Sequence, residues 1–302
     1  MSFNAKIVLF GEYLVLHNSD ALLIPLSKYS GELAFIDTLD GDSGNTHSNR
    51  IMANFYNDLI KEYQPESLTG WFDLTQLKHD VDAGLYFDSD IPVGYGVGSS
   101  GALIAALFDK YSKFSLEHWK KDLSALKTNL SVLESYFHGK SSGLDPLLSY
   151  LDTPIFLQNN KIIPDESHYK DFNPFLIDTK KSRATEGLVS LFNEKCLSTA
   201  YFNIIQTRLI TANDQCIQFL RKGDKERFFS SLKQLSVLQF EYFREMILPE
   251  YESVWIQGLE SGEFYLKLFG AGGGGYLLGF AIDKTVIKQL KERLKSEIIE
   301  LN

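Results

Sequence analysis

The feature that most constrains this chain is a glycine-rich loop, PVGYGVGSS at residues 92–100, which leads directly into an apolar segment. That segment, ALIAALFDKY, is apolar nearly all round a helix, which predicts an internal helix opening at Ser99 and Ser100. Gly94, Gly96 and Gly98 remove side chains from the loop, so backbone amides at a helix N-terminus become available to an anion. The loop predicts a phosphate site, with a glycine-rich turn before a core helix as the alternative.

A second glycine-rich loop, FGAGGGG at residues 269–275, lies between two apolar segments near the end of the chain. A plain hairpin needs only two to five loop residues with one or two glycines. So many glycines lose backbone entropy when they become ordered, which indicates that some group approaches the backbone closely. The alternative is a flexible hairpin.

Three charged residues are candidates for chemistry. Glu134 lies in the last turn of a predicted helix, where a carboxylate opposes the helix dipole unless a cation is bound. Asp145 follows a tight turn at the start of the next helix. Lys6 enters an apolar strand, where it needs a carboxylate or an anion as partner. Taken singly, a solvated glutamate, an N-cap aspartate and an edge lysine remain the alternatives.

The hydrophobic pattern predicts isolated strands separated by runs of helix, which is typical of an α+β fold. The polar segment 164–174 is the candidate linker, and it predicts two domains, 1–165 and 166–302. The predicted strands are 6–16, 21–36, 71–81, 84–90, a hairpin over 153–166 with its turn at Asn159 and Asn160, 175–179, 264–269 and 276–282. The predicted helices are 48–63, one from residue 99, one continuous helix over 116–137, then 185–194, 197–221, 224–246, 250–261 and a last helix capped by Asp283.

Composition excludes several classes of protein. The 39 acidic and 30 basic residues give a net charge of −9, which disfavours nucleic acid and anionic membrane as partners. Two cysteines, Cys196 and Cys216, are too few for a disulfide framework or an all-cysteine zinc site. The N-terminus lacks the pattern of a signal peptide and no apolar run is long enough for a membrane span. We therefore expect a cytoplasmic protein that binds neither nucleic acid nor membrane.

Four motifs occur in an order that resembles the GHMP kinases, the family of galactokinase, homoserine kinase, mevalonate kinase and phosphomevalonate kinase. They are K-(x)4-G-E from Lys6, P-x-G-x-G-x-G-S-S from Pro92, E-(x)6-S-x-G-L-D from Glu134 and K-L-x-G-A-G-G-G-G from Lys267. The resemblance implies an α+β fold of two domains, an N-terminal ribosomal protein S5-like α/β domain that binds ATP and a C-terminal ferredoxin-like α+β domain, with the active site in the cleft between them.

The resemblance also implies roles for individual residues. Asp145 would act as the base on the acceptor hydroxyl, and Lys6 would stabilise it and the transferring phosphoryl group. The ATP phosphates would lie on Gly94, Gly96, Gly98, Ser99, Ser100 and Gly101. Ser100 and Glu134 would hold Mg²⁺. The pocket for a small-molecule acceptor would include Glu12, Tyr13, Ser142, Thr185, Ala271 and Gly272. These parts match what phosphoryl transfer needs, namely positioning, charge neutralisation and a base.

Within the family, the stretch from Glu134 to Asp145 looks most like the mevalonate kinases, which implies conversion of mevalonate to 5-phosphomevalonate in isoprenoid biosynthesis. Another GHMP kinase, such as a phosphomevalonate kinase or a sugar kinase, and a catalytically silent metabolite sensor are the alternatives. Five positions depart from the mevalonate kinase pattern: Tyr13, Asn18, Leu103, Phe269 and Tyr276. Four of the five bear on the shape of the acceptor pocket. We expect a monomer or a homodimer.

Overall fold

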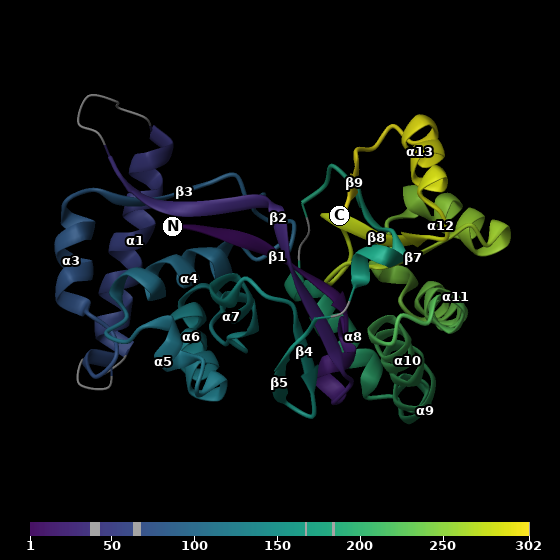
Figure 1. Ribbon diagram of the computed structural model, residues 1–302, viewed down its shortest axis with the longest axis horizontal. Helices are drawn as coiled ribbons and strands as arrows, with labels where there is room; N and C mark the ends of the chain where they lie inside the picture. Colours follow the sequence, from purple (N-terminus) through teal and green to yellow (C-terminus); the bar gives the residue numbers. More distant parts are fainter. Residues whose placement is uncertain (37–42, 63–67, 167, 183–184, 302) are drawn as a thin grey trace. The chain divides into compact units, whose positions relative to one another are not determined.

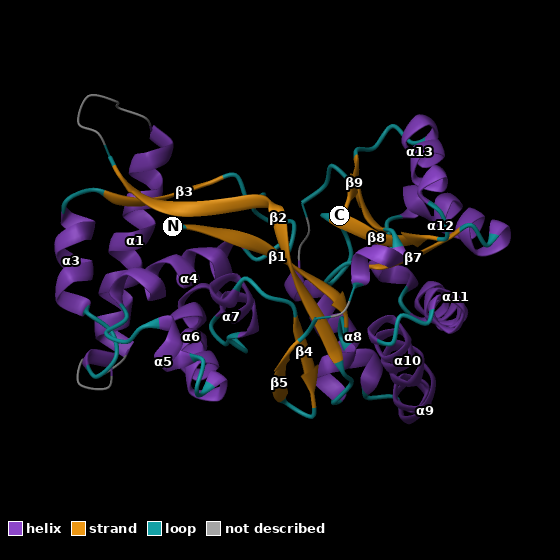
Figure 2. Ribbon diagram, in the orientation of Figure 1, coloured by secondary structure: helices purple, strands orange, loops and turns teal. Residues whose placement is uncertain are grey.

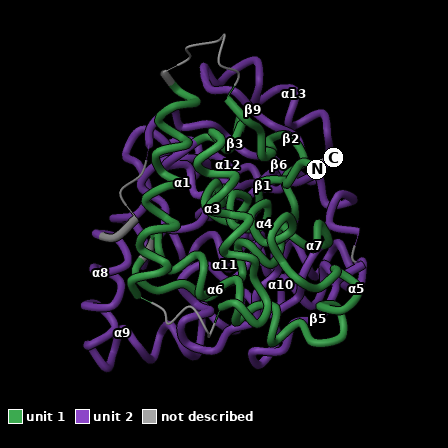
Figure 3. The backbone as a smooth tube through the Cα atoms, turned by 90° about the vertical axis from the view of Figure 1, so that its left-hand side faces the viewer, with its two compact units in different colours: residues 1–6, 25–92, 97–153 green, residues 7–24, 93–96, 154–302 purple. Residues whose placement is uncertain are grey.

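The computed structural model of the protein describes residues 1–36, 43–62, 68–166, 168–182 and 185–301. They form two compact units (Figure 3): unit 1 holds residues 1–6, 25–92 and 97–153, and unit 2 holds 7–24, 93–96 and 154–302. The units interleave along the chain and therefore do not test the predicted domain limits. The division into 1–165 and 166–302 stays a prediction.

The described strands form two antiparallel-rich sheets (Figure 2). In the first sheet the order is β1-β2-β4-β5, with β3 also paired with β2. In the second sheet the order is β7-β8-β6-β9. The bounds are β1 Ser2–Phe10, β2 Ala21–Phe35, β3 Leu85–Ser89, β4 Ile155–Gln158, β5 Lys161–Pro164, β6 Pro174–Asp178, β7 Phe264–Leu268, β8 Tyr276–Ala281 and β9 Ile298–Glu300.

The helices of unit 1 pack around the predicted internal helix α4, which contacts α3, α6 and α7 (Figure 1). Every residue from Gly101 to Phe108 is buried, so the expectation of an internal helix is confirmed. Strand β3 runs antiparallel to β2, with Gly31 opposite Ser89 and Phe35 opposite Leu85. The bounds are α1 Ser43–Glu62, α3 Leu74–Asp82, α4 Ser99–Tyr111, α5 Leu116–Trp119, α6 Leu123–His138 and α7 Leu144–Leu151.

Two predictions for unit 1 are wrong, and one predicted helix is present but starts earlier than expected. The predicted strand 71–81 contains helix α3, because Leu74, Leu77 and Val81 form one buried helical face and Asp73 accepts a hydrogen bond from the Gln76 amide at 3.0 Å. The helix expected from residue 48 begins earlier, at Ser43. The helix expected over 116–137 is two helices, because Asp122 starts a new one by accepting a hydrogen bond from the Ala125 amide at 2.9 Å.

In unit 2 the predicted hairpin β4–β5 is confirmed. Its turn residues Asn159 and Asn160 have φ values of 50° and 61°, as a tight two-residue hairpin turn requires. The strand predicted over 6–16 ends at Phe10, and a short 3-10 helix follows at Leu14–His17. Strand β9 was not predicted, since three residues are too short for a period to be recognised.

The helices of unit 2 cover the second sheet, with α11 and α12 in contact with β7 and α13 in contact with β8 and β9. Asp283 caps α13 as predicted, accepting a hydrogen bond from the Thr285 amide at 2.7 Å. None of the helices in the described part of the chain has the length and apolar character that a membrane crossing requires. The bounds are α8 Thr185–Cys196, α9 Thr199–Ile204, a π-helical turn Ile205–Leu209, α10 Ile210–Arg221, α11 Lys225–Tyr242, α12 Pro249–Ser261, α13 Lys284–Arg293 and the short 3-10 helices Tyr169–Phe172 and Arg244–Met246.

Candidate functional site

Unit 1 brings Lys6 and Asp145 into contact. The ammonium of Lys6, in β1, lies 2.9 Å from Oδ2 of Asp145 in the first turn of α7. The Lys6 side chain is 7% exposed and that of Asp145 is 34% exposed. Asp145, the predicted base, is therefore accessible to solvent, whereas Lys6 is buried. The Lys6 amide also donates a hydrogen bond to the Val97 carbonyl at 2.8 Å, which fastens β1 to the residues just before α4.

Glycines make this contact possible. A Cβ on Gly98 would lie 2.6 Å from Cγ of Lys6, and a Cβ on Gly101 would lie 2.9 Å from the carbonyl carbon of Asp145. A Cβ on Gly143 would lie 2.3 Å from the Lys127 carbonyl oxygen, where the start of α7 meets α6. Side chains at these positions would push Lys6, α4 and α7 apart. Gly98 and Gly101, predicted from the resemblance to contact ATP, therefore also set the geometry of the Lys6–Asp145 pair.

Glu134 lies beside this pair in α6 and is 3% exposed. Burial, and after it the charge of Asp145, raise the pKa of Glu134 to about 7, although hydrogen bonds from Ser141 and Ser100 and the charge of Lys6 act in the opposite direction. The hydroxyl of Ser141 donates to Glu134 Oε2. A cation bound here would favour the ionised carboxylate.

Glu134 and Ser100 supply hard oxygen donors, which fit Mg²⁺. Within the described residues, no group of three or more His, Cys, Asp or Glu side chains could hold a metal ion by itself. Mg²⁺ commonly takes one or two carboxylates and fills its shell with water and phosphate oxygens. The donor set therefore fits Mg²⁺ that arrives with a nucleotide rather than an all-protein metal centre.

The loop between α6 and α7 is held by serine hydroxyls. Ser131 Oγ donates to the Ser141 carbonyl at 2.7 Å, and Ser141 Oγ accepts from the Gly143 amide at 2.9 Å. Ser142, predicted to contact the acceptor, is exposed, and its hydroxyl accepts from the Leu144 amide at 3.3 Å. This network presents Ser142 and Asp145 at the same end of α7.

The three alternate glycines of the first loop have φ values of 79° at Gly94, 74° at Gly96 and 78° at Gly98, all in the region that favours glycine. Gly94 and Gly96 belong to unit 2, and Gly98 belongs to unit 1. Helix α4 begins at Ser99 with no side chain hydrogen-bonded as its N-terminal cap. First-turn amides of a helix make no hydrogen bonds within the helix, and Gly98, at the N-cap position, has no side chain that could accept from them.

In unit 2, Glu12 forms an ion pair with Lys267 of β7. The side chains are 2% and 0% exposed, respectively. The sequence reasoning placed Glu12 in the acceptor pocket and missed Lys267 as its partner. The sequence does indicate that Lys267 needs a partner, because a lysine inside the apolar strand FYLKLF requires a buried carboxylate or anion, as Lys6 does.

Tyr13 and Ala271 also meet in unit 2. The Tyr13 hydroxyl donates to the Ala271 carbonyl at 2.6 Å, and its ring packs against Phe192 and Phe243, with centroids 4.8 Å and 5.6 Å away. Tyr13 has a φ of 60°, an uncommon backbone conformation for a residue other than glycine. Two residues predicted for the acceptor pocket are therefore joined by a direct hydrogen bond.

The loop 269–275 is closely packed, so the alternative of a flexible hairpin is wrong. A Cβ on Gly272 would lie 2.4 Å from the Met246 carbonyl oxygen, and one on Gly274 would lie 2.8 Å from that of Lys181. A Cβ on Gly275 would lie 2.6 Å from the Tyr95 carbonyl oxygen. The predicted close approach is confirmed, and the approaching groups are carbonyls of the chain itself. The side chain of Thr185, the remaining residue predicted for the acceptor pocket, lies outside the described residues.

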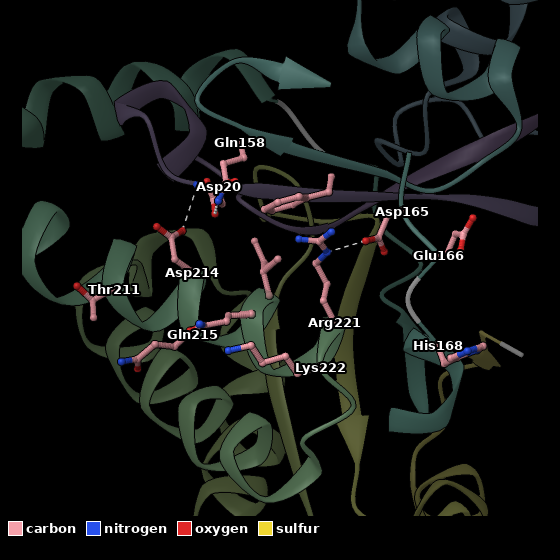
Figure 4. Close-up of a pocket in the computed structure, with 13 residues that line it drawn as sticks. Asp20, Gln158, Asp165, Glu166, His168, Thr211, Asp214, Gln215, Arg221 and Lys222 are labelled. Carbon is pink, nitrogen blue, oxygen red and sulfur yellow. Dashed lines mark hydrogen bonds and ion pairs between the residues drawn. The ribbon is translucent and has the colours of Figure 1, made fainter. Parts of the chain in front are cut away.

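Unit 2 also contains a cavity of about 760 Å³ that none of the predicted site residues lines. Figure 4 shows Arg221 of α10 reaching toward Asp165, where its Nε lies 2.7 Å from Oδ1. The guanidinium stacks on the Phe156 ring at 3.9 Å from its centroid. Asp20 lines the same cavity, and its pKa is raised mainly by burial. The cavity is polar, with charges of both signs, and it is separate from the residues assigned above.

Comparison with known proteins identifies the fold. Residues 58–152 match the family described as GHMP kinases N terminal domain. Over its length the structure resembles that of L. major mevalonate kinase in complex with R-mevalonate, with a TM-score of 0.65, 17% identity and coverage of 99% of this chain and 94% of that one. This chain is related to the GHMP kinases. The predicted α+β GHMP kinase fold is confirmed, whereas the predicted character of each domain stays a prediction.

Curated sequences point to one branch of the GHMP kinases. The chain is 23% identical to mevalonate kinase of Dictyostelium discoideum and 25% identical to that of Arabidopsis thaliana, but it spans only 58% and 60% of their lengths. It is 24% identical to mevalonate kinase of Archaeoglobus fulgidus over 91% of this chain and 89% of that protein. The resemblance to mevalonate kinases within the GHMP kinases is confirmed. Phosphomevalonate kinase of Streptococcus pneumoniae, in complex with phosphomevalonate and AMPPNP, has a similar fold, with a TM-score of 0.61 and 15% identity.

Proposed function

We propose that this chain is an ATP-dependent kinase that phosphorylates a hydroxyl group of a small molecule, and that the acceptor is mevalonate. The observation that carries the proposal is the contact of 2.9 Å between Lys6 and the partly exposed carboxylate of Asp145. A base for a hydroxyl must be reachable by the acceptor, and a neighbouring ammonium can stabilise the charge of the transferring phosphoryl group. Relatives that carry the GHMP kinase fold support the same class of reaction.

In the proposed reaction, Asp145 accepts the proton of the acceptor hydroxyl. The hydroxyl oxygen forms a bond to the γ-phosphorus of ATP while the bond from that phosphorus to the β,γ-bridging oxygen breaks, and ADP leaves. Lys6 stabilises the negative charge that develops on the transferring phosphoryl group. The proton on Asp145 can then pass to solvent, because this carboxylate is about one-third exposed.

Nucleotide and metal would be held by the glycine loop and the neighbouring helices. The loop from Gly94 to Gly101, with Ser99 and Ser100 at the start of α4, would contact the phosphates through backbone amides. Ser100 and Glu134 would hold Mg²⁺, whose charge neutralises that of the phosphates. Among the residues of unit 1, Glu134 is suited to this role because it is buried next to Asp145 and gains from a nearby cation.

Mevalonate is favoured as acceptor because mevalonate kinases are similar to this chain in sequence, one of them over most of both chains. The proposed acceptor pocket is formed by Glu12, Tyr13, Ser142, Thr185, Ala271 and Gly272. Glu12 would belong to its wall rather than contact the acceptor, because its carboxylate is buried against Lys267. Phosphomevalonate is the second candidate, since a phosphomevalonate kinase shares the fold. We expect the product to enter isoprenoid biosynthesis in the cytoplasm. We expect a monomer or homodimer with no nucleic acid or membrane partner.

The test is a coupled assay of ADP release with four acceptors: mevalonate, phosphomevalonate, galactose and homoserine. Mevalonate should give the highest kcat/KM, and the Asp145→Asn variant should be nearly inactive with it. A higher kcat/KM with another acceptor would correct the substrate but keep the kinase. Binding of nucleotide and mevalonate with no turnover would instead identify a metabolite sensor.

A further inference from the structure

The ion pair between Glu12 and Lys267 is the most deeply buried charge pair in the described residues. Lys267 is fully buried in β7, a strand in which every residue is buried, and the Glu12 side chain is 2% exposed. The Lys267 ammonium also donates to the Leu268 carbonyl at 2.8 Å and lies 5.3 Å from the centroid of the Phe10 ring. Burial lowers the pKa of Lys267, and the charge of Glu12 opposes that shift.

Such a pair adds little to stability compared with two apolar residues, because both charges lose their hydration. Buried polar pairs can instead specify one arrangement of the groups that they join. The question is therefore which part of unit 2 this pair fixes.

Glu12 lies at the centre of a strained turn that follows β1. Gly11 has a φ of 112°, and a Cβ there would lie 2.6 Å from Cβ of Ala21. Tyr13 has a φ of 60°, which costs free energy unless other contacts hold the backbone in place. The turn continues into a short helix in which the Val15 amide donates to the Gly11 carbonyl at 3.0 Å.

Two side chains fasten this turn to β7 and the loop after it. Glu12 binds Lys267, and Tyr13 donates a hydrogen bond of 2.6 Å to the carbonyl of Ala271. The two anchoring points, Lys267 and Ala271, are four residues apart in the chain. Together they fix both the position and the direction of the Tyr13 side chain.

We propose that Lys267 is a positioning residue of the acceptor pocket and that it acts through Glu12. The inference rests on the proposed function, which places Tyr13 and Ala271 in that pocket. Glu12, closed off by Lys267, holds the turn in place and does not itself bind the acceptor. Loss of the pair should therefore displace Tyr13 and weaken acceptor binding, while nucleotide binding stays as it is.

A purely structural ion pair would behave differently, and a double variant separates the two roles. Lys267→Met alone removes the positive charge that faces the buried Glu12 carboxylate and should destabilise the protein strongly. Adding Glu12→Gln removes that charge, so most of the unfolding temperature should return. The turn remains unfastened in the double variant, so KM for the acceptor should stay raised by about 10–100-fold. The nucleotide KM should change by less than about two-fold, because the variant keeps every residue that is proposed to bind the nucleotide.

The matched control removes another ion pair of unit 2 that has one deeply buried member. The double variant Arg221→Met with Asp165→Asn breaks the pair at 2.7 Å near Phe156, and it should leave the acceptor KM unchanged. If the Lys267→Met, Glu12→Gln double variant had the wild-type acceptor KM, the pair would be structural only and the proposal would be wrong.

Hydrogen exchange tests the same inference without turnover. Amides of residues 14–16 are hydrogen-bonded in the wild type and should exchange faster in the Lys267→Met, Glu12→Gln variant, with little change in β8. If the wild type phosphorylates none of the acceptors, the proposed function fails, and exchange still decides whether Lys267 fixes the turn. Unchanged exchange at residues 14–16 would overturn the positioning role.

Discussion

The two lysine–carboxylate pairs of this protein differ mainly in their exposure. In unit 1 the Asp145 side chain is 34% exposed beside Lys6, and we call these two residues the open pair. In unit 2 both Glu12 and Lys267 are almost completely buried, and we call them the closed pair. A partly exposed carboxylate can exchange protons with a ligand or with solvent. A closed pair cannot exchange protons readily, and its strong interaction in a medium of low dielectric constant holds backbone segments together. Exposure, rather than residue type, separates a candidate catalytic pair from a positioning pair.

The environments of the two pairs support this distinction. Asp145 lies in the first turn of α7, where the helix dipole stabilises a carboxylate, and Glu134 and Ser100, the proposed metal ligands, lie nearby. Lys267 has as neighbours the ring of Phe10 and the buried thiol of Cys216. Polar groups that could take part in a reaction therefore surround Asp145, whereas Lys267 is packed among buried side chains.

The largest expected effect is on turnover in the open pair. Asp145→Asn keeps the shape of the side chain but removes the base, so kcat with mevalonate should fall by roughly 10²–10⁴-fold. The Kd for nucleotide should change little, since backbone amides and the Ser100–Glu134 pair are intact. Stopped-flow or steady-state turnover and nucleotide titration measure the two quantities. Asp152→Asn, at the other end of α7, is the control and should turn over like wild type. Near-normal turnover in Asp145→Asn would show that another group takes the proton.

Breaking the closed pair by removing one partner should lower stability more than breaking the open pair. Lys267→Met should lower the free energy of unfolding by about 3–5 kcal/mol, because it removes the positive charge opposite the buried Glu12 carboxylate. Lys6→Met should cost about 1 kcal/mol or less, because solvent reaches the Asp145 carboxylate that remains. Urea denaturation of both variants at one pH gives the comparison. Equal losses would contradict the distinction between an open and a closed pair.

The sequence predicted the open pair better than the closed one, for a physical reason. Lys6 in an apolar strand requires a partner, and the family resemblance singled out Asp145, which the structure brings to 2.9 Å. Lys267 obeys the same requirement, but Glu12 lies 255 residues away and no local pattern reveals that contact. Its role, like those of the other site residues, stays a prediction.

Local patterns succeeded or failed according to how much tertiary structure they depended on. The all-round apolar character of α4 and the Asn159–Asn160 turn are local properties, and both were predicted correctly. The segment 71–81 was read as a strand although its Leu74 and Leu77 face one side of a helix. The loop 269–275 was expected to receive a close contact, but only the folded chain shows that its own carbonyls supply it.

A smaller effect concerns the pH dependence of stability in unit 1. The pKa of Glu134 is raised from the ordinary value of 4.5 to about 7, so between these values the folded protein binds more protons than the unfolded chain. Its contribution to stability is therefore complete below about pH 4.5 and is lost as pH rises through about 7. Glu134→Gln is neutral at every pH, so without nucleotide or metal it should be more stable than wild type at pH 8 by about 1–3 kcal/mol, and equal to it near pH 4.5.

Urea denaturation at the two pH values measures this difference, with Glu117→Gln as the control. Glu117 belongs to α5 and its side chain is 78% exposed, so its substitution should change stability by the same small amount at both pH values. A difference between Glu134→Gln and wild type that does not grow with pH would mean that Glu134 is already ionised in the free protein. The open pair would then have a second permanent negative charge beside it.

The smallest effect tests the second contact that fastens the turn after β1, the hydrogen bond from Tyr13 to Ala271. Tyr13→Phe removes only the hydroxyl that donates to the Ala271 carbonyl and keeps the ring packed on Phe192 and Phe243. The lost hydrogen bond should cost about 0.5–1.5 kcal/mol of stability. Because Lys267 still holds Glu12, the turn should stay in place, and the acceptor KM should rise by only about two- to ten-fold, corresponding to the same loss of free energy. Tyr251→Phe, which removes a buried hydroxyl bonded to the Asp178 carbonyl, is the control for stability and should leave that KM unchanged. A rise in KM as large as in the Lys267→Met, Glu12→Gln variant would mean that Tyr13, rather than the buried ion pair, sets the position of the turn.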